Sequence, residues 1–129
     1  MMKSIPVWKQ ELSDGVHAAR LASLYCCAPA ETASEAARYA AVLDGLEKTF
    51  GSHAEAGLYS APGRTEIGGN HTDHQHGRVL AGSVNIDMIA AAAPNDKNQL
   101  RVQSEGYDLC VIDLNDLEAV SYTHLTLPT

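Results

Sequence analysis

The highest density of chemically reactive side chains in this sequence lies in residues 61–80, APGRTEIGGNHTDHQHGRVL. His71 and Asp73 are two positions apart, so in an extended segment both side chains point to the same face and can meet one ligand. An ionised carboxylate suits the vicinal hydroxyls of a sugar, and an imidazole donates or accepts beside it. Arg64 adds a permanent positive charge and a planar fork of donors, which suits a phosphate or a charge that develops during phosphoryl transfer. These residue types indicate a sugar-phosphorylating site.

The glycines of this stretch admit two interpretations. Gly63, Gly68 and Gly69 allow the backbone to approach a ligand closely, but such glycines also occur in plain turns between strands, and composition alone favours the turn. The stretch has neither the Lys-Ser/Thr pair of a P-loop nor the G-x-G-x-x-G spacing of a dinucleotide-binding loop. Neither nucleotide-binding signature is therefore present.

A metal site is the competing interpretation of the same residues. His71, Asp73, His74 and His76 form a compact set of nitrogen and oxygen donors of the kind that zinc accepts. Structural zinc sites usually draw ligand pairs from separated elements, and no second Cys or His pair stands nearby. We therefore assign no metal ligand in this sequence and no role to His74 or His76.

Composition and charge exclude several classes of function. The formal net charge is −7 and Lys and Arg do not cluster, which argues against a nucleic-acid partner or an anionic membrane surface. No stretch approaches the roughly 18 apolar residues of a membrane span, and the first residues lack the apolar core of a signal peptide. The three cysteines suggest no disulfide framework. We expect a cytoplasmic protein without membrane partners.

Apolar spacing predicts two helices near the start of the chain. Four apolar residues recur at steps of four, three and four and share one helical stripe: Tyr39, Leu43, Leu46 and Phe50. They predict a helix over residues 34–50, with Ser34 as its N-cap and Gly51 at its C-terminal end. A shorter helix is expected over about residues 16–25.

Short apolar runs separated by glycine, asparagine and proline predict strands in the rest of the chain. The predicted strands are residues 57–61, 79–81, 87–93, 100–104 and 109–114. The run PNDKN at residues 94–98 is predicted to be a hairpin loop between two of them. Two N-terminal helices followed by a mixed or antiparallel sheet indicate the α+β class.

The order and spacing of residues 61–80 resemble the sugar-binding signature of galactokinases within the GHMP kinase family. The residues that carry this resemblance are Ala61, Pro62, Gly63, Arg64, Gly69, His71, Thr72, Asp73, Gly77, Val79 and Leu80. The resemblance covers roughly residues 43–114. It implies that residues 1–120 are the N-terminal portion of a GHMP-kinase domain, incomplete here, with the signature at 61–80. Residues 121–129, SYTHLTLPT, resemble the ends of translated sequencing fragments, and we expect them to be a non-native tail.

The resemblance also implies roles for individual residues. Arg64 becomes the catalytic residue, near the anomeric hydroxyl of the sugar and the transferred phosphate, where it stabilises charge. His71 and Asp73 hold sugar hydroxyls, and Asn70, which stands where the family commonly has an acidic residue, hydrogen bonds another. Arg64 therefore counts among the substrate-binding residues as well. Glu66 is either a partner of Arg64 or a solvated carboxylate.

The implied activity is ATP-dependent phosphorylation of galactose, or a related hexose, at the anomeric hydroxyl. The family's ATP-binding loop and catalytic aspartate lie beyond the end of this sequence, so ATP and Mg²⁺ are expected only for the full-length protein and no residue here is assigned to them. Because phosphoryl transfer requires nucleotide, metal and acceptor to be aligned together, we expect this chain to be inactive alone. The alternatives are a non-catalytic, sugar-sensing regulator and a small His-rich metal-binding module.

Overall fold

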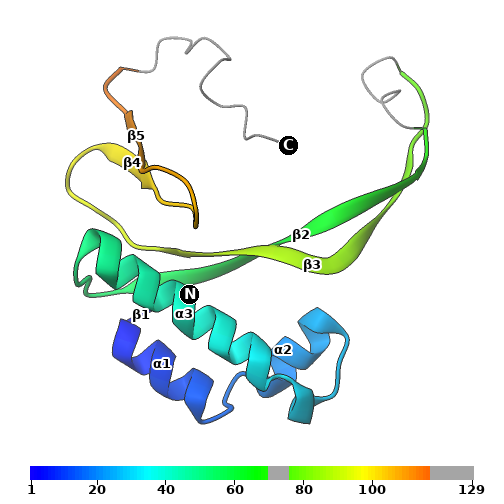
Figure 1. Ribbon diagram of the computed structural model, residues 1–129, viewed down its shortest axis with the longest axis horizontal. Coiled ribbons are helices and arrows are strands. Elements are labelled where there is room, and N and C mark those ends of the chain that lie inside the picture. Colours follow the sequence, from blue (N-terminus) through cyan, green and yellow to red (C-terminus); the bar gives the residue numbers. More distant parts are fainter. Residues whose placement is uncertain (70–75, 117–129) are drawn as a thin grey trace. The chain divides into compact units, whose positions relative to one another are not determined.

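The computed structural model describes residues 1–69 and 76–116, which fall into two compact units, one from Met1 to Ala93 and the other starting at Pro94. The first unit contains, in order, β1 (Met2–Lys3), α1 (Ile5–Ser13), α2 (Ala18–Tyr25), the 3₁₀ helix η1 (Pro29–Glu31), α3 (Ala33–Phe50), β2 (Ala56–Gly68) and β3 (Leu80–Ala92) (Figure 1). The described part of the second unit contains β4 (Gln99–Val102) and β5 (Cys110–Asp113).

Both sheets are antiparallel. In the first unit the strand order is β1-β2-β3, so β2 is central, and in the second β4 pairs with β5. The α+β class is thus confirmed. The described residues contain one α-helix beyond the two expected, because α1 also forms on a short apolar stripe. Its inward residues Ile5, Trp8 and Leu12 are spaced by three and four and are all buried.

The two predicted helices are confirmed, with one correction at a terminus. Helix α3 begins at Ala33 rather than Ser34, and Thr32 occupies the N-cap position. The predicted Ser34 cap was wrong because the preceding 3₁₀ turn runs directly into the helix, and the Thr32 hydroxyl donates to the Pro29 carbonyl instead, at 2.8 Å. At the other end Gly51 is the C-cap, with a φ of +84° that glycine adopts readily, although its ψ of −177° is not that of a left-handed helical residue.

Strands β2 and β3 are longer than predicted, while β4 and β5 are slightly shorter than the predicted 100–104 and 109–114. Strand β2 continues past residue 61 to Gly68, and residues 79–81 and 87–93 contribute to one strand, β3, rather than two. The predicted hairpin loop at residues 94–98 was wrong, because it connects β3 to β4, which belong to different sheets. The Asn95 side chain organises this connection by accepting from the Lys97 N–H at 3.0 Å and donating to the Gln99 carbonyl at 3.0 Å.

The core of the first unit lies between the helices and one face of the β2–β3 pair (Figure 1). Its buried residues are Ile5, Trp8, Leu12, Leu21, Tyr25, Tyr39, Leu43, Leu46 and Ala56, with Leu58, Ile89 and Ala91 packed against them from the strands. Trp8 ties α1 to β2 by donating its Nε1–H to the Ala56 carbonyl at 2.8 Å. Farther along, residues 61–69 and 76–86 are mostly exposed, and we call them the distal hairpin.

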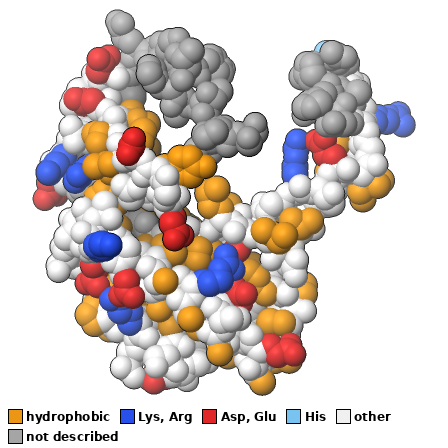
Figure 2. Space-filling view, viewed as in Figure 1, with side chains coloured by type: hydrophobic (Ala, Val, Ile, Leu, Met, Phe, Trp, Pro, Cys, Tyr) orange, Lys and Arg blue, Asp and Glu red, His pale blue; other side chains and the backbone are white. Residues whose placement is uncertain are grey.

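Charges of both signs are spread over the surface. On the face shown in Figure 2, acidic and basic side chains are interspersed, and hydrophobic side chains gather between them. In the described ranges, no helix combines the length and the apolar character needed to cross a membrane. The tail at 121–129 lies outside the described residues, so its origin stays a prediction.

We expect Leu43→Ala to lower the free energy of unfolding by about 2–5 kcal/mol, because Leu43 is fully buried and the truncation leaves a cavity in the core. Leu24→Ala is the matched control, since Leu24 lies on α2 with 48% of its surface exposed. Urea unfolding followed by circular dichroism measures both. Equal losses for the two variants would contradict this placement of the core.

Candidate functional site

Arg64 lies on strand β2 rather than in a loop. Its partner across the sheet is Ser83, whereas Pro62 pairs with Asp87, so Gly63 alone on β2 stands opposite residues 84–86 of β3. This irregularity is a bulge in the pairing. A β-carbon at Gly63 would lie 3.2 Å from the Ile86 carbonyl oxygen, so the two strands pack closely beside Arg64.

Glu66 is the ion-pair partner of Arg64. Arg64 Nη2 donates to Glu66 Oε1 at 2.7 Å, which decides between the two interpretations of Glu66 in favour of the partner. The two residues are two positions apart on an extended strand and therefore share a face. The Arg64 side chain is 67% exposed and that of Glu66 only 19%, so the carboxylate holds the guanidinium along the strand while its outer edge faces outward.

Gly69 marks the point where β2 leaves the sheet. Its φ is +84°, and a β-carbon there would lie 2.1 Å from the carbonyl oxygen of Arg78. No other residue type fits such an approach without backbone movement. By contrast, a β-carbon at Gly68 would meet nothing within 4 Å. Of the two, only Gly69 is required to be glycine by the described backbone.

The remaining predicted site residues lie outside the described part of the chain. These are Asn70, His71 and Asp73, together with His74 of the metal alternative, so their placement beside Arg64 stays a prediction. His76 is described and exposed, with a φ of +60°. Among residues 1–69 and 76–116, no three His, Cys, Asp or Glu side chains are placed to hold a metal ion.

A polar cluster that was not predicted surrounds the buried carboxylate of Asp87 on β3, and we call it the Asp87 cluster. Ser60 Oγ and Tyr25 Oη donate to Asp87 Oδ2 at 2.5 and 2.6 Å. Arg38 Nη2 donates to Oδ1 at 2.9 Å, and the Tyr39 hydroxyl lies 3.1 Å from that of Tyr25. The cluster thus joins α2, α3, β2 and β3 around a carboxylate that is 3% exposed.

Opposing effects set the protonation of this cluster. Burial raises the pKa of Asp87, but hydrogen bonds from Ser60, Tyr25 and Arg38 outweigh it, and the pKa lies below its ordinary value. Burial, followed by the hydrogen bond to Asp87, raises the pKa of the Tyr25 phenol. Hydrogen bonds to Asp87 and Glu35 raise the pKa of the Arg38 guanidinium. At neutral pH the cluster therefore holds an Asp–Arg ion pair and a neutral phenol.

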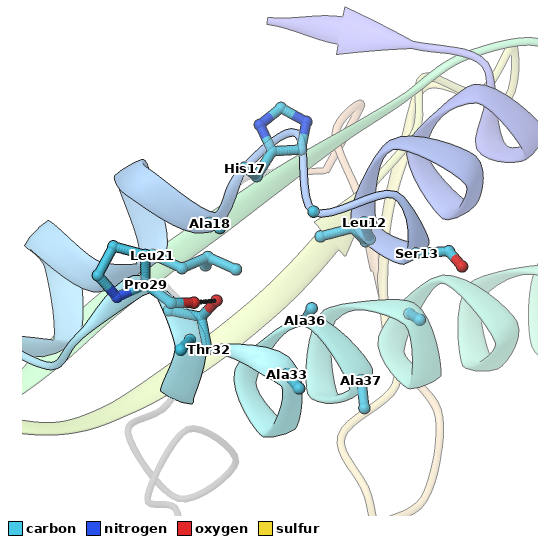
Figure 3. A pocket seen from close by; sticks show the side chains of 13 residues that line it. Leu12, Ser13, His17, Ala18, Leu21, Pro29, Thr32, Ala33, Ala36 and Ala37 are labelled. Atoms are coloured by element: carbon cyan, nitrogen blue, oxygen red, sulfur yellow. Dashed lines mark hydrogen bonds between the residues drawn. The ribbon is translucent and has the colours of Figure 1, made fainter.

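A cavity of about 440 Å³ lies among helices α1, α2 and α3 (Figure 3). Its walls are mainly small or apolar side chains, including Leu12, Leu21, Ala33, Ala36 and Ala37. Thr32, one of its few polar groups, already donates to Pro29. A sugar needs several convergent hydrogen-bonding groups, so this cavity does not suit a polyhydroxylated ligand.

Comparison with known proteins matches a segment that includes the distal hairpin. Residues 46–94 match the galactokinase galactose-binding signature, a range that starts near the end of α3 and includes β2, β3 and Asp87. No solved structure matches the chain.

Curated relatives also match part of this chain. A galactokinase from Ligilactobacillus salivarius is 36% identical over 78 residues, which cover 58% of this chain and 20% of the relative. Galactokinases from Lacticaseibacillus casei and Streptococcus suis are 33% and 34% identical over 51% and 53% of this chain. The chain thus spans about a fifth of the length of the curated relatives it matches.

We expect Gly69→Ala to lower the free energy of unfolding by more than about 1 kcal/mol, because the new methyl group meets the Arg78 carbonyl and the φ is positive. Gly68→Ala should change it far less, since the space around Gly68 is open. Chemical denaturation of both variants tests this. A loss at Gly68 as large as that at Gly69 would show that the backbone approach is not what requires glycine.

Asp87 should make the free energy of unfolding depend on pH in the acidic range. Because its pKa is lowered on folding, its stabilising contribution is present above the unfolded pKa of about 3.9 and is lost as pH falls through the folded value. We therefore expect the difference in unfolding free energy between the wild type and Asp87→Asn to be largest at neutral pH and to shrink below about pH 4.

Urea titrations across this pH range measure that difference. Asp14→Asn removes the same charge at an exposed position where the carboxylate accepts only from Gln10 in the described contacts, and controls for net charge. A wild-type advantage over Asp87→Asn that stays constant down to pH 2.5 would contradict the assignment.

Proposed function

Because this chain carries a galactokinase-like galactose-binding signature over residues 46–94, we propose that its distal hairpin is the sugar-binding half of a sugar 1-kinase site. The whole protein would phosphorylate galactose, or a related hexose, at the anomeric hydroxyl, giving galactose 1-phosphate. The observation that carries this proposal is the signature match across the segment in which Arg64 is held outward by Glu66. The curated relatives that match part of this chain bear the name galactokinase, which supports the same proposal.

Each residue of the signature has a role in this proposal. Arg64 binds near the anomeric hydroxyl and stabilises the charge that develops on the transferred phosphate. His71 and Asp73 bind sugar hydroxyls, and Asn70 binds another by donating or accepting. Glu66 orients Arg64, since an ion pair along the strand limits the directions that the guanidinium can take.

ATP and Mg²⁺ belong to the proposal for the whole protein, where ATP would supply the phosphoryl group. The described residues do not fit a place for them: no three acidic, His or Cys side chains in those ranges gather as a metal site, and the sequence has no P-loop. The chain by itself is proposed to bind sugar without transferring phosphate.

The proposed compartment is the cytoplasm. Cys26, Cys27 and Cys110 are free thiols, which suits a reducing environment.

We expect galactose to bind the chain in a calorimetric titration, and Arg64→Ala to weaken the affinity about tenfold, because a charge-assisted hydrogen bond to the sugar is lost. Arg20→Ala is the matched control, since Arg20 is an exposed arginine on α2. Addition of ATP and Mg²⁺ should yield no galactose 1-phosphate. A wild-type chain that does not bind galactose, or an Arg64→Ala variant that binds as well as the wild type, would overturn the proposed site.

A further inference from the structure

We propose that Asp87 is a positioning residue, which holds the distal hairpin against helices α2 and α3 and so sets the location of Arg64. The link to sugar binding rests on the function proposed above, whereas the mechanical part of the claim does not. Asp87 is 3% exposed, so it acts through the strands rather than by touching a ligand.

The Asp87 cluster sits where the hairpin emerges from the helical layer. On β2, Ala56 is buried and Leu58 and Ser60 are half-buried, but every residue from Ala61 to Thr65 is exposed. On β3, Asp87 shares the inward face with Ile89 and Ala91, which pack against the core. Beyond the cluster, apolar burial contributes little to fixing the hairpin, so side-chain hydrogen bonds at this point carry more of the restraint.

One carboxylate connects two helices to two strands here. Tyr25 donates from α2 and Arg38 from α3, while Ser60 donates from the neighbouring strand β2. Ser60 and Asp87 are diagonal neighbours on one face, since Ser60 pairs with Ile89 and Pro62 with Asp87. The resulting restraints come from different directions, and together they fix both strands of the hairpin.

Where Pro62 pairs with Asp87, the backbone ladder is weak, and contact between the strands depends more on side-chain hydrogen bonds. Pro62 has no N–H to donate to the ladder, and the pairing becomes irregular immediately afterwards, at Gly63. The hydrogen bond from Ser60 to Asp87 crosses between the strands at this weak point. Arg64 follows two residues after Pro62, across a bulge where a β-carbon at Gly63 would lie only 3.2 Å from the Ile86 carbonyl oxygen, so the strands are close here and their displacement moves Arg64.

The test is amide hydrogen exchange on the chain with Asp87→Asn, which keeps the size of the side chain but removes its charge and one acceptor oxygen. We expect exchange in the distal hairpin to accelerate at least about tenfold more than exchange in α1 and α3. Ser60→Ala removes only the donor from β2 and should accelerate the same region by a smaller factor, which keeps the test valid if Asp87→Asn folds poorly.

Leu46→Ala is the matched control, because it truncates a buried core residue of α3 outside the described contacts of Asp87. It should accelerate exchange in helices and hairpin alike, as a merely structural loss does. The proposal is overturned if Asp87→Asn gives the uniform pattern of Leu46→Ala, or if neither Asp87→Asn nor Ser60→Ala changes exchange in the hairpin.

A galactose titration of the same variants separates this claim from the proposed function. If the hairpin binds sugar, Asp87→Asn should weaken the affinity about tenfold through displacement of Arg64, and Leu46→Ala should not at a temperature where it stays folded. A wild-type chain that binds no galactose rejects the proposed function, while the exchange pattern still decides whether Asp87 positions the hairpin.

Discussion

The carboxylate of Asp87, buried between the helices and the β2–β3 pair, links the helical layer of the first unit to its two long strands. A buried charge is costly unless donors surround it, and here donors from Tyr25, Arg38 and Ser60 do so. The same contacts that satisfy the charge also fix the relative position of helices and strands. Apolar packing around Leu43 also stabilises the unit, but it comes mainly from helix residues. Apolar contacts are less directional than hydrogen bonds and therefore fix the position of the strands less narrowly.

The distal hairpin combines two further local constraints beyond this anchor. Glu66 holds the guanidinium of Arg64 along β2, and Gly69 permits the chain to pass the Arg78 carbonyl as it leaves the sheet. Both features lie within the galactokinase galactose-binding signature. The close approach of the backbone at residue 69 to the Arg78 carbonyl explains why residue 69 is glycine. The ion pair with Glu66 leaves the positive charge of Arg64 directed outward.

The helices could be predicted because their apolar stripes, such as the one through Leu43, face a buried core and carry the helical period. The extent of β2 could not be predicted, because the distal hairpin is exposed on both faces and lacks the apolar alternation that identifies strands. Pro62 and Gly63 are also residue types that are typical of turns. Arg64 was singled out from the sequence, and the chemistry assigned to it stays a prediction, whereas its position on a strand was not predicted. The sequence places Asp87 at the start of a predicted strand of apolar residues, but it does not predict the role of this carboxylate. Its hydrogen-bond donors are distant in sequence, and only the packing of helices against strands brings them to it.

We propose that the sugar site lies on the distal hairpin rather than in the cavity among α1, α2 and α3. A galactose titration of the isotopically labelled chain, followed through the chemical shifts of its backbone amides, tests this placement. We expect saturable shifts concentrated in residues 63–79, with smaller shifts around Asp87. Shifts confined to the cavity among α1, α2 and α3, or none at any galactose concentration, would contradict it.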